Sequence, residues 1–132
     1  MEIGQTAELS RSVTEADVRA YAELTGDFNP AHVDAEYAAA SPFKGIIAHG
    51  MLTAGYVSAV LAMRLPGPGA IYLAQTLRFT KPVRPGDTIT ARVEVVELVP
   101  EKRRARLATT CRNQHGELVL DGEATVLIPA AS

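Results

Sequence analysis

Two hydrophobic patterns divide the chain near Pro66. Before this residue, apolar side chains recur at spacings of three and four, which is the period of an amphipathic helix. After it, apolar and polar residues alternate, which is the period of a strand with one buried face. The pattern therefore predicts helices in the first half of the chain and a sheet in the second.

Three helices are predicted before Pro66. Thr14 is a typical N-cap followed by acidic residues, and Gly26 ends the first helix. Asp34 can cap a second, short helix that runs to residue 40. The third helix, Gly50 to Met63, has almost no polar face, so we expect it to be surrounded by other parts of the protein.

Strands are predicted from four alternating segments, and residues 5–13 are compatible with either a short first strand or an entry segment. The four segments begin at Ile71, Ile89, Arg104 and Leu118, and the turns between them are Pro85-Gly86-Asp87, Glu101 to Arg103 and Gln114-His115-Gly116. In the second segment the alternation slips at Val95 and Val96, which predicts a β-bulge. The four strands follow one another closely and suggest a meander.

One hydrophobic helix followed by four consecutive strands predicts an α+β fold of hot-dog type, an antiparallel β-sheet wrapped around a central hydrophobic helix. The 132 residues suffice for one domain with one core, so residues 1–132 are interpreted as a single domain. Edge strands in so small a sheet are readily completed by a second copy. We therefore expect a homodimer.

Composition and charge exclude several classes of protein. With 47% hydrophobic and 21% charged residues, the chain has the composition of a soluble globular domain. A net charge of −2 argues against nucleic-acid binding, and no stretch is apolar enough for a membrane span. The acidic, weakly apolar N-terminus predicts no signal peptide. A single cysteine, Cys111, excludes an internal disulfide or a cysteine-rich zinc site and fits a cytoplasmic location.

Side chains suited to catalysis are concentrated between residues 21 and 34. Asp27, Asn29 and His32 lie within six residues, beside a helix-breaking glycine and proline. We expect them on a tight irregular loop, where a carboxylate and an imidazole are close enough to share proton transfer. The letters G-D-x-N-P also form an ordinary turn, because Asp and Asn satisfy local backbone groups. On these residues alone, a structural and a catalytic role are equally good interpretations.

The sequence around this loop resembles a known family. The run YAELTGDFNPAHVD at 21–34, followed by HGML at 49–52, is similar to the motif of (R)-specific enoyl-CoA hydratases, the type 2 or MaoC-like dehydratase family. The similarity continues through residues 71–79 and 82–87, and it is greatest to the short single-domain members that feed polyhydroxyalkanoate synthesis. This resemblance implies a hot-dog homodimer that uses no metal and no redox cofactor.

The reaction implied by the resemblance is the reversible hydration of a trans-2-enoyl-CoA to an (R)-3-hydroxyacyl-CoA by syn addition of water. Such a reaction needs a base, an acid and donors for the enolate oxygen. By resemblance, Asp27 and His32 hold the water, and which of them makes each proton transfer stays open. Gly50 opens the third helix, so its backbone N–H is free to bind the thioester oxygen; the alternative is that this glycine only relieves crowding.

Further residues are candidates for substrate contacts. Asn29 could fix the loop or contact the substrate, and a purely structural role is equally plausible. Ser58 matches a family position that lines the site, although packing is the commoner role for a serine in a helix rich in small residues. Arg78, Lys81 and Arg84 concentrate positive charge near a turn and are candidates for the CoA phosphates, with ordinary surface charge as the alternative.

His49 could join Asp27 and His32 in a site of two histidines and one carboxylate, a set that binds iron or zinc in other proteins. The spacing does not place two ligands on one helix face, so we expect no metal. We place His49 among the substrate-binding candidates and expect it to brace the loop or the helix end.

Three other functions are compatible with the same fold. A 3-hydroxyacyl-carrier-protein dehydratase of fatty-acid elongation is the nearest alternative. A thioesterase is less well supported, because it would not need an acid and an imidazole on one loop. A non-catalytic acyl-CoA-binding module is the alternative outside the enzymes.

Overall fold

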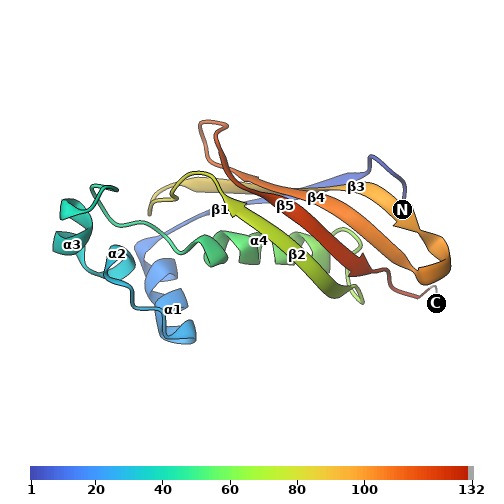
Figure 1. Cartoon of the computed structure of the whole chain (residues 1–132), viewed down its shortest axis with the longest axis horizontal. Coiled ribbons are helices and arrows are strands. Elements are labelled where there is room, and N and C mark those ends of the chain that lie inside the picture. The colour runs from blue at the N-terminus through green and yellow to red at the C-terminus, as the bar shows by residue number, and fades with distance from the viewer. Residues whose placement is uncertain (131–132) are drawn as a thin grey trace.

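A five-stranded antiparallel sheet with one long helix against it dominates the computed structural model, which describes residues 1–130 (Figure 1). The strands are β1 (Thr6–Ser12), β2 (Ile71–Phe79), β3 (Thr88–Val99), β4 (Arg104–Arg112) and β5 (Leu118–Leu127). The helices are α1 (Glu15–Thr25), α2 (Pro30–Val33), α3 (Ala35–Ala40) and α4 (Gly50–Met63), with a 3-10 turn η1 (Pro100–Lys102). The predicted α+β class and hot-dog arrangement are confirmed.

The order of the strands differs from the predicted meander in one respect. The sheet runs β1-β3-β4-β5-β2, so β3, β4 and β5 form a meander while β2 pairs with β5 at the far edge. The prediction that β2 belongs to the same meander was wrong. The link between β2 and β3 is too long for a tight hairpin and contains Pro82 and Pro85, which cannot donate to a strand ladder. Instead it passes the start of α4, where the Ala48 N–H donates to the Val83 carbonyl at 2.6 Å.

The core lies between the sheet and one side of α4. The alternating apolar residues of β3 and β4 are buried and meet the buried side of the helix. On the strands these are Ile89, Ala91, Val93, Val95, Ala105, Leu107 and Cys111, and on the helix Val57, Val60 and Leu61. The predicted bulge is confirmed, because the β3–β4 register shifts between Val95 and Glu97.

The other side of α4 is not covered by any part of residues 1–130. Met51 and Met63 are 52% and 68% exposed, which contradicts the prediction that the helix is surrounded. The neighbouring edge strand β2 is also open on its apolar residues, including Tyr72 and Leu73. The chain therefore presents one apolar surface made of α4 and β2. None of the helices within residues 1–130 is long and apolar enough to cross a membrane.

The short helices gather beyond one end of the sheet (Figure 1). Thr14 caps α1 in a capping box with Asp17, and Gly26 ends it with φ of 83°, as the sequence predicts. The next segment differs from the predicted irregular loop, because Pro30–Val33 forms the helical turn α2. Asn29 is its N-cap and proline suits its first position, so local residues favour helix here. His32 is consequently held on a helical turn.

Candidate active site

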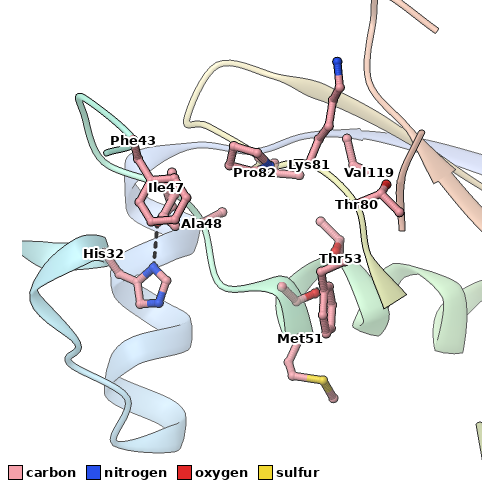
Figure 2. A pocket seen from close by; sticks show the side chains of 13 residues that line it. His32, Phe43, Ile47, Ala48, Met51, Thr53, Thr80, Lys81, Pro82 and Val119 are labelled. Carbon is pink, nitrogen blue, oxygen red and sulfur yellow. Dashed lines mark hydrogen bonds between the residues drawn. The ribbon is translucent and has the colours of Figure 1, made fainter. Parts of the chain in front are cut away.

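A cavity of about 390 Å³ opens at the N-terminal end of α4 (Figure 2). Its wall combines α2, the connector between α3 and α4 (residues 41–49), the first turn of α4, the end of β2 with the segment after it, and the start of β5. The residues are His32, Phe43, Ile47, Ala48, Gly50, Met51, Thr53, Phe79, Thr80, Lys81, Pro82, Val83 and Val119. The wall is mainly apolar, with an imidazole at one side, so the cavity suits an apolar chain that reacts at one polar end.

The structure brings together the acid and the two imidazoles singled out in the sequence. One ligand-type atom from each of Asp27, His32 and His49 lies within 4.8 Å of the other two. The Asp27 side chain is exposed and accepts a hydrogen bond from the Asn29 N–H at 3.2 Å. The backbone N–H of Asp27 donates to the Thr25 hydroxyl at 3.2 Å, which fixes the turn after α1. The expected closeness of Asp27 and His32 is therefore observed, and their catalytic roles stay predictions.

His32 has a defined tautomer. Its Nδ1 lies 2.7 Å from the Ile47 carbonyl oxygen, drawn as the dashed line in Figure 2. A carbonyl oxygen only accepts, so Nδ1 carries the proton and Nε2 of the neutral ring keeps its lone pair. The nitrogen free to take a proton is consequently Nε2, as a general base requires.

His49 lies behind the cavity and is only 2% exposed. It is the N-cap of α4, and its Nε2–H donates to the Asp27 carbonyl oxygen at 2.9 Å. Its ring stacks on that of His32 with the ring centroids 3.8 Å apart. The ring of Tyr21 packs against it with a centroid distance of 4.5 Å. The bracing of the loop expected from the sequence is observed, and His49 is not among the residues that line the cavity.

The stacking of the two histidines bears on the possibility of a metal. Their planes are 27° apart, so the rings are nearly parallel. Lone pairs on imidazole nitrogens lie in the ring plane, and two rings stacked in this way cannot both point a lone pair at one nearby ion. The arrangement fits a metal poorly, and a site without metal remains our prediction.

Gly50 is the first residue of α4 and lines the cavity. Its N–H has no partner within the helix, and the positive end of the helix dipole is directed toward this end of the cavity. A Cβ at this position would lie 2.6 Å from Cε1 of Phe79. Both interpretations made from the sequence, a free donor and relief of crowding, therefore have a geometric basis.

The predicted cations lie in three different places. Lys81 lines the cavity and forms an ion pair with Glu117, which lowers the pKa of that carboxyl. Arg84 donates to the Phe43 carbonyl and so braces the connector. Arg78 lines a separate hollow beside Asp121. Its neighbour Phe79 faces the cavity, and consecutive side chains of a strand point to opposite faces. Of the three, only Lys81 reaches the wall of the cavity.

Two other predicted contacts lie outside the cavity. Asn29 is exposed, and its side-chain oxygen accepts from the Ala31 N–H at 3.1 Å as the cap of α2. Ser58 lines a shallow groove between α4 and β2, together with Met51 and Tyr72. That groove adjoins the cavity through Met51, so Ser58 is near the site without facing His32.

The sequence did not identify Thr53 or Phe79 as site residues. Thr53 is buried, and its hydroxyl donates to the Gly50 carbonyl at 2.7 Å, which ties down the first turn of α4. Phe79 was part of a predicted strand without a role of its own, and it lines the cavity next to Gly50. A usable signal was its position as the last residue of β2, just before the proline-containing link.

Cys111 offers no alternative nucleophile. It is fully buried under α4, and burial raises the pKa of its thiol to about 12. The thiolate form is therefore scarce near neutral pH.

Comparisons with known proteins converge on one family. The sequence profile of the MaoC-like domain matches residues 1–117. A "3-hydroxybutyryl-CoA dehydratase" of Methylorubrum extorquens is 54% identical over 98% of this chain and 82% of its own length. An "(R)-specific enoyl-CoA hydratase" of Rhodospirillum rubrum is 54% identical over 96% and 88%. The solved structure of an (R)-hydratase from Aeromonas caviae involved in PHA biosynthesis superimposes with a TM-score of 0.95 at 46% identity, covering 98% of both chains.

Proposed function

Since this chain belongs to the MaoC-like domain family, we propose that it is a hydro-lyase that hydrates trans-2-enoyl-CoA reversibly to (R)-3-hydroxyacyl-CoA. One observation carries the proposal: a carboxylate oxygen of Asp27 lies within 4.8 Å of a ring nitrogen of His32, and His32 lines the apolar cavity at the N-terminal end of α4. The relatives named as hydratases and dehydratases support the same reaction class.

In the proposed reaction, Asp27 and His32 hold one water molecule. Nε2 of His32 takes a proton as the water oxygen bonds to C3, while Asp27 orients the water. The electrons of the double bond move toward the thioester and form an enolate, whose oxygen accepts the Gly50 N–H. C2 then receives a proton from the same pair of side chains, so the substrate gains one complete water. Addition of both parts of one water from one side gives syn addition and one enantiomer.

No metal and no redox cofactor takes part in the proposed reaction, because hydration involves no net oxidation and the donor at Gly50 can bind the enolate oxygen. CoA enters as part of the substrate. Lys81 is the best placed of the predicted cations for a CoA phosphate, since it combines positive charge with a place in the cavity wall. A cytoplasmic location, based on the single cysteine, remains part of the proposal.

The experiment that tests this function measures the absorbance of the conjugated thioester when the protein is added to crotonyl-CoA and to longer trans-2-enoyl-CoA substrates. We expect the absorbance to fall and the product to be the (R)-3-hydroxyacyl-CoA. Faster reaction with acyl-carrier-protein thioesters would favour the dehydratase of fatty-acid elongation. Release of free thiol would identify a thioesterase, and tight binding without a change in absorbance would identify a non-catalytic module.

We also propose that the protein is a homodimer joined through the apolar surface of α4 and β2. β2 is an edge strand with an unpaired side, and its apolar residues are exposed next to the exposed methionines of α4. A second copy placed on this surface would extend the sheet and cover both elements.

Replacing Leu73 by Lys is expected to convert the dimer to a monomer. Leu73 is 44% exposed on β2, and a lysine there would place a charge in the interface. Light scattering during size-exclusion chromatography measures the mass directly. Ile3→Lys is the matched control, because Ile3 is 66% exposed beside β1 at the opposite edge of the sheet. If the dimer survives in Leu73→Lys but not in Ile3→Lys, the interface lies at the β1 edge and the proposed interface on α4 and β2 is wrong.

A further inference from the structure

The His49 side chain is buried between the two segments that carry the proposed catalytic groups. His49 is the N-cap of α4, directly before Gly50, and its side chain reaches back to the turn that holds Asp27. Its ring lies between Tyr21 of α1 and His32 of α2. Being 2% exposed and absent from the cavity wall, it does not meet the substrate directly.

The hydrogen bonds of His32 and His49 join the same two segments, residues 27–32 and the connector, in opposite directions. His32, on α2, donates from Nδ1 to the Ile47 carbonyl in the connector. His49, at the end of that connector, donates from Nε2 to the Asp27 carbonyl. A backbone bond from the Ile47 N–H to the Ala31 carbonyl, at 3.2 Å, lies between them. The segment of Asp27 and His32 is thus tied to the segment that leads to Gly50.

The two ring nitrogens of His49 differ in their hydrogen bonding: Nε2 donates to the Asp27 carbonyl, and Nδ1 does not. Nδ1 is buried and has no hydrogen-bond partner within residues 1–130. A buried polar atom without a partner is costly, so an apolar side chain of similar size would be the better choice for packing alone. What the imidazole adds over such a side chain is the Nε2–H that holds the Asp27 carbonyl.

We propose that His49 is a positioning residue for the hydration reaction. Its Nε2–H fixes the backbone of Asp27, and its ring face fixes the plane of His32, so that both side chains address one water next to the Gly50 N–H. This inference rests on the proposed function. A small displacement of a reacting group can lower the rate by about 100-fold, which is why such a contact matters without touching the substrate.

Two substitutions separate the contacts that His49 makes. His49→Gln keeps an N–H donor near the position of Nε2 and loses the ring, whereas His49→Phe keeps a flat ring and loses the donor. We expect kcat to fall by about 10-fold in His49→Gln and by about 100-fold in His49→Phe, with KM changed by less than about threefold in both. His115→Gln and His115→Phe are matched controls, because His115 is an exposed turn residue.

A loss of kcat with KM retained, and partial rescue by the glutamine, supports positioning. Unchanged kcat in both variants would overturn it. A loss in His49→Gln at least as large as in His49→Phe would overturn the role of the Nε2–H, and a loss that only follows a lower melting temperature would overturn positioning altogether. If the unaltered protein hydrates no enoyl thioester, the proposed function fails and the positioning role fails with it. If it is active and the His49 variants are unaffected, only the positioning role fails.

A second measurement tests the geometry without any use of activity. Nitrogen-15 spectra of the imidazoles in the whole protein, recorded at alkaline pH, report which nitrogen carries the proton. We expect opposite tautomers, with the proton on Nδ1 in His32 and on Nε2 in His49. A proton on Nδ1 of His49 would overturn the inference, because Nε2 could then not donate to Asp27.

Discussion

Replacing Asp27 by Asn or His32 by Ala is expected to lower kcat for crotonyl-CoA hydration by about 10²–10⁴-fold, the range associated with loss of a general acid or base. Asparagine keeps the size of Asp27 and an oxygen for the Asn29 N–H, and loses the ability to take or give a proton. Alanine removes Nε2 of His32, the ring nitrogen that can take a proton while Nδ1 is bonded to the Ile47 carbonyl. The decrease in thioester absorbance measures the rate.

The two substitutions together should cost little more than the worse one alone, because groups that act on one water act as a unit. His115→Ala is the control for loss of a histidine, and it should retain full activity because His115 is exposed on a turn. Circular dichroism and light scattering show whether the variants keep fold and mass. Full activity in either Asp27→Asn or His32→Ala would end the assignment of that residue.

The second large effect is expected at Gly50. In Gly50→Ala, the new Cβ occupies the space next to the N–H that the thioester oxygen would approach, and we expect kcat to fall by about 10²–10³-fold. The loss corresponds to one blocked oxyanion donor, roughly 3–4 kcal/mol in the transition state. Steady-state kinetics with crotonyl-CoA measure it.

The Cβ also meets the Phe79 ring at 2.6 Å, so the variant has two effects that need separation. Phe79→Ala removes the ring, and the double variant Gly50→Ala with Phe79→Ala removes the clash while the Cβ stays. If Gly50 only relieves crowding against Phe79, the double variant should be as active as Phe79→Ala. If the approach to the N–H is what counts, the double variant should stay about 10²-fold below it.

The parts of the fold that depend on neighbouring residues could be predicted from the sequence. Thr14, Gly26 and Asp34 mark helix ends through contacts within a turn, and the alternation in β3 and β4 needs only the two faces of one strand. The place of β2 could not be predicted in this way, because pairing with β5 joins segments far apart in the chain. Its apolar residues look like core residues whether they face the core or a second molecule.

The site was predictable to the extent that its groups are close in the sequence. Asp27 and His32 are five residues apart, so a short turn is enough to bring them together. The contacts of His49 with both segments depend on how the connector folds back, and no local pattern reports that. Arg78 illustrates a different limit: its charge suggested a phosphate contact, while its neighbour Phe79 takes the cavity side of the strand.

The division of the cavity wall between two parts of the fold has a consequence for changing the enzyme. The proposed proton-transferring groups lie on the turn after α1 and on α2, beyond the end of the sheet, whereas Phe79 and Val119 belong to strands of the sheet (Figure 1). Residues that shape the space for the acyl chain can therefore be exchanged without altering the segment that holds Asp27 and His32. The choice of substrate can thus be varied apart from the chemistry: a library confined to strand residues of the wall, with Gly50 unchanged, would alter the first while preserving the second.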